Sequence, residues 1–256
     1  MIRAMIFDLD GTLVQTEKLK ALSYARTVVD LSPQELQEAE VIDAFKEVVG
    51  LSRKEVAEYL IVRFNLEKSL QECMKDLGVD TQWQALSQLR VHYYEELLAD
   101  PNILRNNQWP HNMALLQAGR KAKCLIGLAT MSYCKQVQRI LRILDLEHAF
   151  DFIASRDDVE QGKPDPEIYN LVAAELDVPT EDCLVIEDSP IGVKAALAAG
   201  MSVIAVTTPF TREAFSKSHL LDQRWIVDNP ETLPEVVNNL MAEHNRISHL
   251  FKDSSI

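Results

Sequence analysis

Short runs of apolar residues recur along the chain, and most of them are unbroken rather than alternating with polar residues. Strands with this pattern are covered on both faces, as in a parallel sheet flanked by helices. Helical patterns separate the later runs, which favours strands alternating with helices. The runs span residues 4–7, 124–129, 152–154, 184–186, 203–206 and 225–227. We therefore predict an α/β fold built on one parallel sheet with helices on both faces.

The stretch from residue 16 to residue 98 has a different character, because few strand signals occur in it. Trp83, Leu86, Tyr93 and Leu97 follow a helical spacing, and Ser52-x-x-Glu55 fits the capping-box pattern that begins a helix. We predict an all-helical insertion of four or five helices over residues 16–98. The sheet domain would then be discontinuous, with residues 1–15 and 99–256 forming one core.

Serine residues mark two later helix starts. Ser189 stands directly before Pro190, and a capping serine followed by proline at the first helical position is a common helix start. Ser132 stands before apolar residues at helical spacing over residues 133–144. We predict that Ser132 is the N-cap of that helix.

Charge and composition limit the classes of partner. The chain has 256 residues, with 26 Lys and Arg against 39 Asp and Glu, and its formal net charge is −13. Such a charge disfavours nucleic acid. No segment approaches the roughly 18 apolar residues of a membrane span, and the apolar stretch before Asp8 is too brief for a signal peptide. The four cysteines are widely separated, as is typical of a reducing compartment. We expect a cytoplasmic protein without a nucleic-acid or membrane partner.

Two carboxylates follow the first apolar run, in the sequence Asp8-Leu9-Asp10-Gly11-Thr12. In open α/β sheets the ligand site lies beyond the carboxyl ends of the strands, which places both acids well for function. Close carboxylates repel each other, so they favour a bound cation or the protonation of one of them. Oxygen ligands select a hard cation such as Mg²⁺. A polar turn at a strand end is the alternative interpretation.

Three other strand ends, or the loops that follow them, carry polar residues. Thr130 follows the run 124–129, and Met131 and Ser132 lead from it into a helix. Lys163 lies in the loop after residue 154, and the fourth run leads into Glu187-Asp188. Because the carboxyl ends of parallel strands share one edge, we expect these groups to meet there.

Together these residues resemble the haloacid dehalogenase superfamily. The string DLDGT at 8–12, Thr130, Lys163 and the pair Glu187-Asp188 match its four motifs in order, and GKPDPEIY and IEDSPIGVKAALAAGM are especially specific strings. The helical insertion is similar to the subfamily I cap of β-phosphoglucomutase-like and phosphoglycolate phosphatase-like members. The resemblance implies a Rossmann-like core with a helical cap over residues 16–98.

The resemblance also implies a role for each motif residue. Asp8 would be the nucleophile that forms an aspartyl phosphate, and Asp10 the general acid and base. Thr130 and the backbone N–H of Met131 would bind the phosphoryl group, and Lys163 would neutralise its charge. The implied Mg²⁺ ligands are Asp8, the carbonyl oxygen of Asp10, Asp188 and, directly or through water, Glu187.

These roles imply an Mg²⁺-dependent phosphatase that acts on a small phosphorylated metabolite such as a sugar phosphate or phosphoglycolate. A sugar phosphomutase of the β-phosphoglucomutase type is the alternative, and a non-catalytic phosphoacceptor protein is a weaker one. Gly50 and Arg53 are candidate substrate-binding residues of the cap, since similar strings reach the substrate in sugar-phosphate members. Family dehalogenases lack an acid at the position of Asp10, which favours phosphoryl transfer. We expect a monomer, with a weak dimer as the alternative.

Overall fold

The computed structural model describes residues 1–49 and 51–253, and the chain divides into two compact units. One unit comprises Met1–Gln15 and Asn107–Ile256, and the other comprises Thr16–Asn106. We expected the helical insertion to end at residue 98. The division falls later because a short helix, α6 (Pro101–Arg105), follows in the second unit and is capped by the side chain of Asp100.

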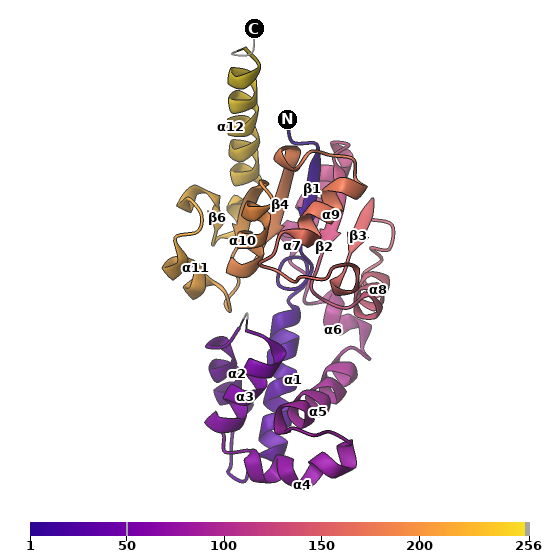
Figure 1. Ribbon diagram of the computed structural model, residues 1–256, viewed down its shortest axis with the longest axis vertical. Coiled ribbons are helices and arrows are strands. Elements are labelled where there is room, and N and C mark those ends of the chain that lie inside the picture. Colours follow the sequence, from indigo (N-terminus) through magenta and orange to yellow (C-terminus); the bar gives the residue numbers. More distant parts are fainter. Residues whose placement is uncertain (50, 254–256) are drawn as a thin grey trace. The chain divides into compact units, whose positions relative to one another are not determined.

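The first unit is built on a sheet of six parallel strands in the order β3-β2-β1-β4-β5-β6 (Figure 1). The strands are β1 (Ala4–Phe7), β2 (Leu125–Ala129), β3 (Phe152–Ala154), β4 (Cys183–Glu187), β5 (Ser202–Val206) and β6 (Ile226–Val227). Each lies within two residues of its predicted run. The sequence prediction of a parallel α/β sheet with a Rossmann-like arrangement is confirmed.

Helices cover both faces of this sheet. They are α7 (Pro110–Lys121), α8 (Cys134–Ile143), α9 (Glu167–Glu175), α10 (Pro190–Ala198), α11 (Arg212–Ser218) and α12 (Leu233–Asp253), with single 3-10 turns at Arg156–Asp158, Thr180–Asp182, Gln223–Trp225 and Pro230–Thr232. Gly127 of β2 lies against α9, whereas the side chain of its neighbour Ile126 lies against Gly119 of α7. Because successive residues of a strand point to opposite faces, α7 and α9 cover opposite faces.

The centre of the sheet is fully buried. All four residues of β1 and all five of β4 are shielded from solvent, which explains why these runs contain no alternating polar residues. The strands pack against apolar residues of α9 and α10 such as Tyr169, Val172 and Val193. The strand ends that carry the acidic motifs are therefore fixed by strands that are buried along their whole length.

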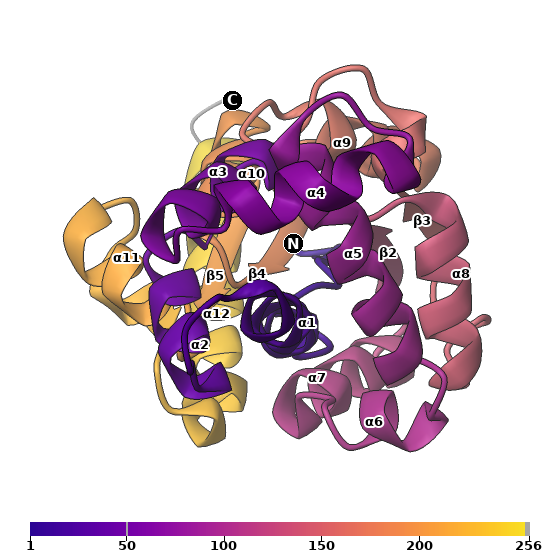
Figure 2. The same ribbon diagram turned by 90° about the horizontal axis from the view of Figure 1, so that it is seen from below.

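The described residues of the second unit form six helices, of which five lie within residues 16–98, matching the four or five expected there, and α6 follows them. Besides α6 they are α1 (Thr16–Leu31), α2 (Glu38–Lys46), α3 (Arg53–Arg63), α4 (Glu67–Leu77) and α5 (Gln82–Leu97). Helix α1, seen end-on in Figure 2, packs against α2 and α5, and α5 also packs against α3 and α4. Ser52 caps α3 and forms the predicted capping box with Glu55. Over the described residues, no helix combines the length and apolar character needed to cross a membrane.

We predict that Gly127→Ala lowers the stability of the protein. A Cβ atom at Gly127 would lie 2.4 Å from Cγ1 of Val172 in α9, and overpacking of this kind costs about 1–3 kcal/mol. Urea unfolding followed by circular dichroism measures the loss. The same substitution made in a Val172→Ala background should cost less, and an equal cost in both backgrounds would contradict the packing argument.

Candidate active site

The end of β1 brings Asp8 and Asp10 into a tight turn. The backbone N–H of Asp8 donates to the carbonyl oxygen of Ile186 at 3.0 Å, which extends the pairing of β1 with β4. Gly11 then has a φ of +86°, and a Cβ atom there would lie 2.1 Å from Oδ2 of Asp188. Glycine is required at this position, because the chain turns sharply against the Asp188 carboxylate.

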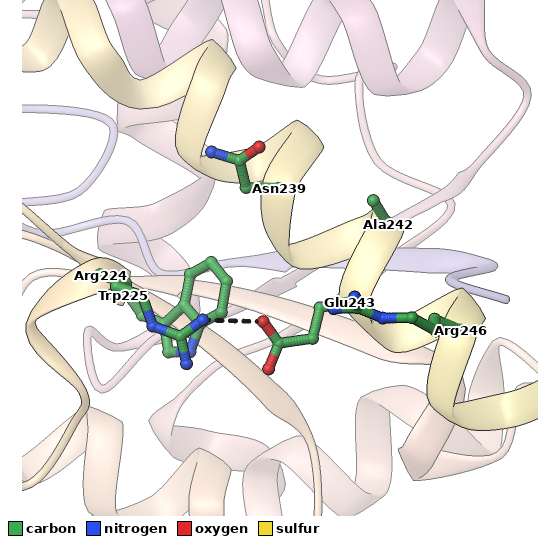
Figure 3. Close-up of a pocket in the computed structure, with 6 residues that line it drawn as sticks. All are labelled: Arg224, Trp225, Asn239, Ala242, Glu243 and Arg246. Atoms are coloured by element: carbon green, nitrogen blue, oxygen red, sulfur yellow. Dashed lines mark hydrogen bonds and ion pairs between the residues drawn. The ribbon is translucent and has the colours of Figure 1, made fainter. Parts of the chain in front are cut away.

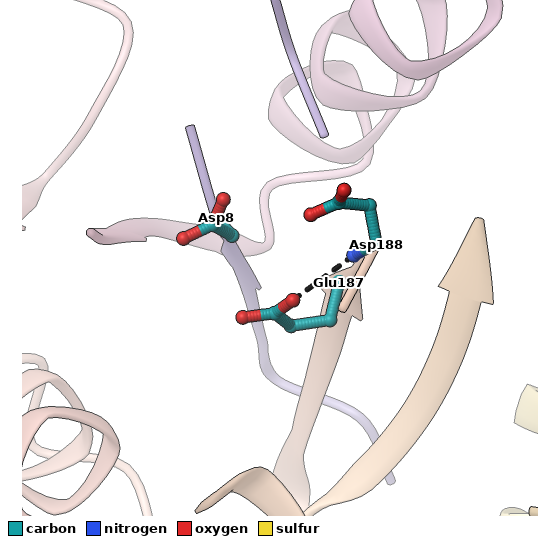
Figure 4. A group of neighbouring side chains, drawn as sticks. All are labelled: Asp8, Glu187 and Asp188. Atoms are coloured by element: carbon teal, nitrogen blue, oxygen red, sulfur yellow. Dashed lines mark hydrogen bonds between the residues drawn. The ribbon is translucent and has the colours of Figure 1, made fainter. Parts of the chain in front are cut away.

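The end of β4 places Glu187 and Asp188 beside Asp8, as the sequence predicted for the carboxyl ends of neighbouring parallel strands (Figure 4). One carboxylate oxygen of each of the three residues lies within 4.8 Å of those of the other two. All three side chains are buried. This acidic cluster is the most concentrated negative charge in the described interior of the sheet unit.

Lys163 supplies the positive charge within this cluster. Its Nζ atom lies 2.7 Å from Oδ1 of Asp8 and 2.7 Å from Oε1 of Glu187, and it donates to the carbonyl oxygen of Ala129 at 3.0 Å. The ring of Tyr169 lies beneath the ammonium group, with 4.9 Å from Nζ to the ring centroid. The lysine side chain is only 5% exposed, so these contacts replace its hydration.

Glu187 receives donors on both carboxylate oxygens. Besides Lys163, the hydroxyl of Tyr169 donates to Oε1 at 2.9 Å. The backbone N–H groups of Asp188 and Ser189 and the Ser189 hydroxyl each donate to Oε2 at 3.0 Å. Ser189 also caps α10, as predicted, by accepting from the N–H of Gly192. The sequence analysis did not identify Tyr169, although its place six residues after Lys163, on the buried face of α9, was a usable signal.

The pKa values of Asp8 and Glu187 differ although both residues are buried, because more hydrogen-bond donors are described for Glu187 than for Asp8. Burial raises the pKa of Asp8 from 3.8 to about 8, although the charge of Lys163 opposes this rise. For Glu187, burial acts in the same direction, but Lys163 and the other hydrogen bonds hold its pKa below the ordinary value. Burial alone would lower the pKa of Lys163, whereas Asp8 and Glu187 raise it well above 10.5. Glu187 and Lys163 therefore form the charged pair, and Asp8 is the carboxyl group that an added positive charge would ionise.

The loop after β2 reaches the side chain of Asp10. Thr130 donates to Oδ2 of Asp10 at 3.2 Å, and Ser132 donates to the same oxygen at 2.5 Å. The prediction that Ser132 caps the next helix is wrong, because α8 begins at Cys134 with Tyr133 as N-cap. The Ser132 hydroxyl is directed to Asp10 instead. Met131, beside these residues, is half-buried and lies near Gly162.

The residues of the cluster fit a hard divalent cation. Three carboxylates converge, Lys163 pairs with two of them, and carboxylate oxygens are the ligands that Mg²⁺ prefers. The close approach of Gly11 to Asp188 leaves a cradle that a larger residue would fill. Asp8 and Asp188 are the best placed of the three to hold a cation directly, because both oxygens of Glu187 already receive donors.

Gly50 and Arg53 are the two predicted substrate residues of the helical unit. Gly50 lies outside the described residues. Arg53 is the first residue of α3 and is exposed, and its charge acts on Tyr24 and Arg90. The sequence analysis did not identify Arg90, which is 7% exposed and whose guanidinium lies 5.2 Å from the ring of Tyr24 and 5.3 Å from that of Tyr94. An arginine spaced with Leu86, Tyr94 and Leu97 on the buried stripe of α5 was the available signal.

A surface pocket of about 610 Å³ lies elsewhere in the sheet unit (Figure 3). Arg224 there stacks on Trp225 and pairs with Glu243 of α12 at 2.9 Å. The other lining residues are Asn239, Ala242 and Arg246. Trp225 directly precedes β6, so the pocket lies at the amino ends of the strands, opposite the acidic cluster.

We predict that Lys163→Met destabilises the protein by about 3 kcal/mol, because removing one partner of a buried ion pair leaves uncompensated charge. Urea unfolding at neutral pH measures the change. Lys217→Met is the matched control, since Lys217 pairs with Glu213 on the surface of α11 and its loss should leave the unfolding midpoint unchanged. Equal midpoints for both variants would contradict a buried role for Lys163.

Comparison with known proteins agrees with this geometry. The chain is 32% identical over 203 residues to a phosphorylated carbohydrates phosphatase of Thermotoga maritima, covering 79% of this chain and 84% of that protein. It is 32% identical over 216 residues to a phosphoglycolate phosphatase of Rhodospirillum rubrum, covering 83% of each chain. It is 28% identical over 206 residues to a β-phosphoglucomutase of Bacillus subtilis, covering 80% of this chain and 83% of that protein.

Solved structures share the fold. A β-phosphoglucomutase structure from Clostridium difficile matches with a TM-score of 0.65 and 24% identity, covering 94% of this chain and 100% of that chain. The family model described as haloacid dehalogenase-like hydrolase matches residues 5–206, which include the acidic cluster, Lys163 and Thr130. The expected resemblance is confirmed, and the chain belongs to the haloacid dehalogenase-like hydrolases.

Proposed function

We propose that the protein is an Mg²⁺-dependent phosphatase that hydrolyses a small phosphorylated metabolite through an aspartyl phosphate on Asp8. The observation that carries this proposal is the pairing of Asp8 with Lys163 at 2.7 Å, while Thr130 and Ser132 hold Asp10 two residues away. A nucleophile, a charge-neutralising lysine and an acid thus share one strand end. Relatives named as phosphatases support the same reaction class.

The reaction has two steps. In the first, an oxygen of Asp8 bonds to phosphorus while the bond to the ester oxygen breaks, and Asp10 gives that departing oxygen a proton. In the second, Asp10 takes a proton from water and the water oxygen bonds to phosphorus while the bond from the Asp8 oxygen to phosphorus breaks. This step frees the Asp8 carboxylate and gives inorganic phosphate. Lys163 keeps its positive charge beside the phosphoryl group throughout, because its pKa lies well above 10.5. Positioning and charge stabilisation therefore supply most of the catalysis.

Asp8, Asp188 and the carbonyl oxygen of Asp10 would hold Mg²⁺, with Glu187 acting through water. A bound ion supplies positive charge that favours the ionised form of Asp8 and offsets charge on the phosphoryl group. Thr130 and the backbone N–H of Met131 would bind phosphoryl oxygens. Glu187 keeps its place as the partner of Lys163 and Tyr169.

A phosphomutase is the second candidate, supported by the relative named β-phosphoglucomutase. A mutase transfers the phosphoryl group back to a sugar rather than to water. Steady phosphate release from a panel of metabolites would favour the phosphatase, and sugar-phosphate isomerisation stimulated by a bisphosphate would favour the mutase. A single stoichiometric phosphorylation without turnover would indicate the phosphoacceptor protein.

We predict that Asp8→Asn abolishes phosphate release from every ester of such a panel, because an amide is a poor nucleophile. An excess of chelator should abolish release by the unmodified protein, and added Mg²⁺ should restore it. Phosphate is measured colorimetrically, with circular dichroism as the folding control. Activity of Asp8→Asn within tenfold of the unmodified protein would refute the nucleophile, and full activity in chelator with no residual metal would refute the metal role.

The start of α3 carries an exposed positive charge on Arg53. Arg53 is exposed at the start of α3, where a cation opposes the helix macrodipole and so gains nothing from its own helix. Its charge adds to that of Arg90 near Tyr24. We propose that Gly50 and Arg53 contribute to substrate binding, with Arg53 contacting an anionic or hydroxyl-rich part remote from the transferred phosphate.

We therefore predict that Arg53→Ala lowers kcat/KM at least tenfold for the best metabolite of the panel and leaves 4-nitrophenyl phosphate unchanged. Remote contacts of this kind discriminate among substrates. Arg63→Ala is the matched control, because Arg63 is an exposed arginine in the last turn of the same helix. Equal kinetics of Arg53→Ala and the unmodified protein on both esters would end the hypothesis.

A further inference from the structure

The side chain of Ser132 makes the shortest hydrogen bond among those described for Asp10. Its hydroxyl lies 2.5 Å from Oδ2 of Asp10, and the serine is only 7% exposed. A hydroxyl at this distance from a carboxyl oxygen makes a strong, well-directed hydrogen bond. The residue is not a helix cap, so the fold of α8 does not account for a serine here.

Two hydrogen bonds made by its own backbone hold Ser132 in place. Its N–H donates to Oγ1 of Thr130 at 3.1 Å, and its carbonyl oxygen accepts from the N–H of Arg156 at 3.1 Å. Thr130 is in turn tied to β3 by its N–H, which donates to the carbonyl oxygen of Ala154. The hydroxyl is therefore presented to Asp10 from a fixed loop.

Thr130 alone is not a sufficient anchor for Asp10 during the reaction. A threonine hydroxyl has one hydrogen, and in this structure Thr130 donates it to Oδ2 of Asp10. If Thr130 binds a phosphoryl oxygen, that hydrogen turns to the substrate and the bond to Asp10 is lost. Ser132 is the neighbouring donor that keeps its bond to Asp10 in both situations.

We propose that Ser132 is a positioning residue that holds the Asp10 carboxyl while Thr130 serves the phosphoryl group. Both described hydrogen bonds fall on Oδ2, so the loop after β2 fixes the orientation of the Asp10 carboxyl group. This inference rests on the proposed phosphatase reaction, in which Asp10 is the general acid. General acid catalysis contributes about 10²- to 10⁴-fold, so a misplaced acid has a measurable cost.

The test compares Ser132→Ala with the unmodified protein on phenyl phosphate and 4-nitrophenyl phosphate. These esters have similar size, but only the first has a leaving group that strongly needs a proton. We expect kcat/KM to fall about tenfold to a hundredfold for phenyl phosphate and less than threefold for 4-nitrophenyl phosphate. Ser132→Thr, which keeps the hydroxyl, should restore most of the loss. An equal fall for both esters, or no restoration by threonine, would overturn the proposal.

Ser155→Ala is the matched control, because Ser155 is a buried serine that caps the adjacent Arg156–Asp158 turn without touching Asp10. It should affect the two esters equally. Crystal structures of the unmodified protein, Ser132→Ala and Ser155→Ala give a readout independent of turnover. The Asp10 side chain should move only in Ser132→Ala. If the unmodified protein releases phosphate from neither ester nor any metabolite of the panel, the proposed function fails. These structures still decide the positioning role, because an unmoved Asp10 in Ser132→Ala refutes it.

Discussion

One ammonium group shared between two carboxylates is the interaction on which the acidic cluster at the end of the sheet depends. Lys163 bridges Asp8 on the central strand and Glu187 on its neighbour, and all three side chains are almost completely buried. Without it, two buried acids would face each other across 4.8 Å or less without a counter-ion. The surrounding donors, Tyr169 and Ser189 among them, bind Glu187, whereas Lys163 is the donor described for the Asp8 carboxylate.

Asp8 directly follows the central strand β1, and this position explains how side chains from several strand ends can meet around it. The loops after β2 and β3 reach it from one side, and β4 reaches it from the other. Each strand contributes one kind of group: hydroxyls from Thr130 and Ser132, the ammonium of Lys163, and the carboxylates of Glu187 and Asp188. Parallel strands make this convergence possible, because all their carboxyl ends lie at one edge.

Much of this arrangement could be predicted, because it depends on patterns that are local in sequence. Unbroken apolar runs located the six strands, and the residues directly after them located the acidic cluster. The predictions that were wrong depend on packing, which no local sequence pattern reports. A serine can cap a helix or donate to a carboxylate. The sequence pattern predicted the cap for Ser132, whereas the structure shows the hydrogen bond to Asp10. On α5 the sequence pattern placed Tyr93 on the buried face, but the structure buries Tyr94 there, together with Arg90. The helical unit extends past residue 98 because Asp100 and Pro101 begin another helix.

The contacts of Asp8 and Asp10 span very long sequence separations, and this has a consequence during synthesis. Asp8 and Lys163 are 155 positions apart, and Asp10 and Ser132 are 122 apart. A ribosome therefore produces Asp8 first and its counter-ion Lys163 more than half a chain later. Until β2 (Leu125–Ala129) has been made, β1 has neither of its neighbouring strands, whereas α1 to α5 make their mutual contacts within Thr16–Asn106. Local contacts form faster than distant ones, so the helical unit has its partners before the sheet does. An incomplete nascent chain consequently has the helical contacts of Thr16–Asn106 complete while Asp8 still lacks Lys163 and Glu187.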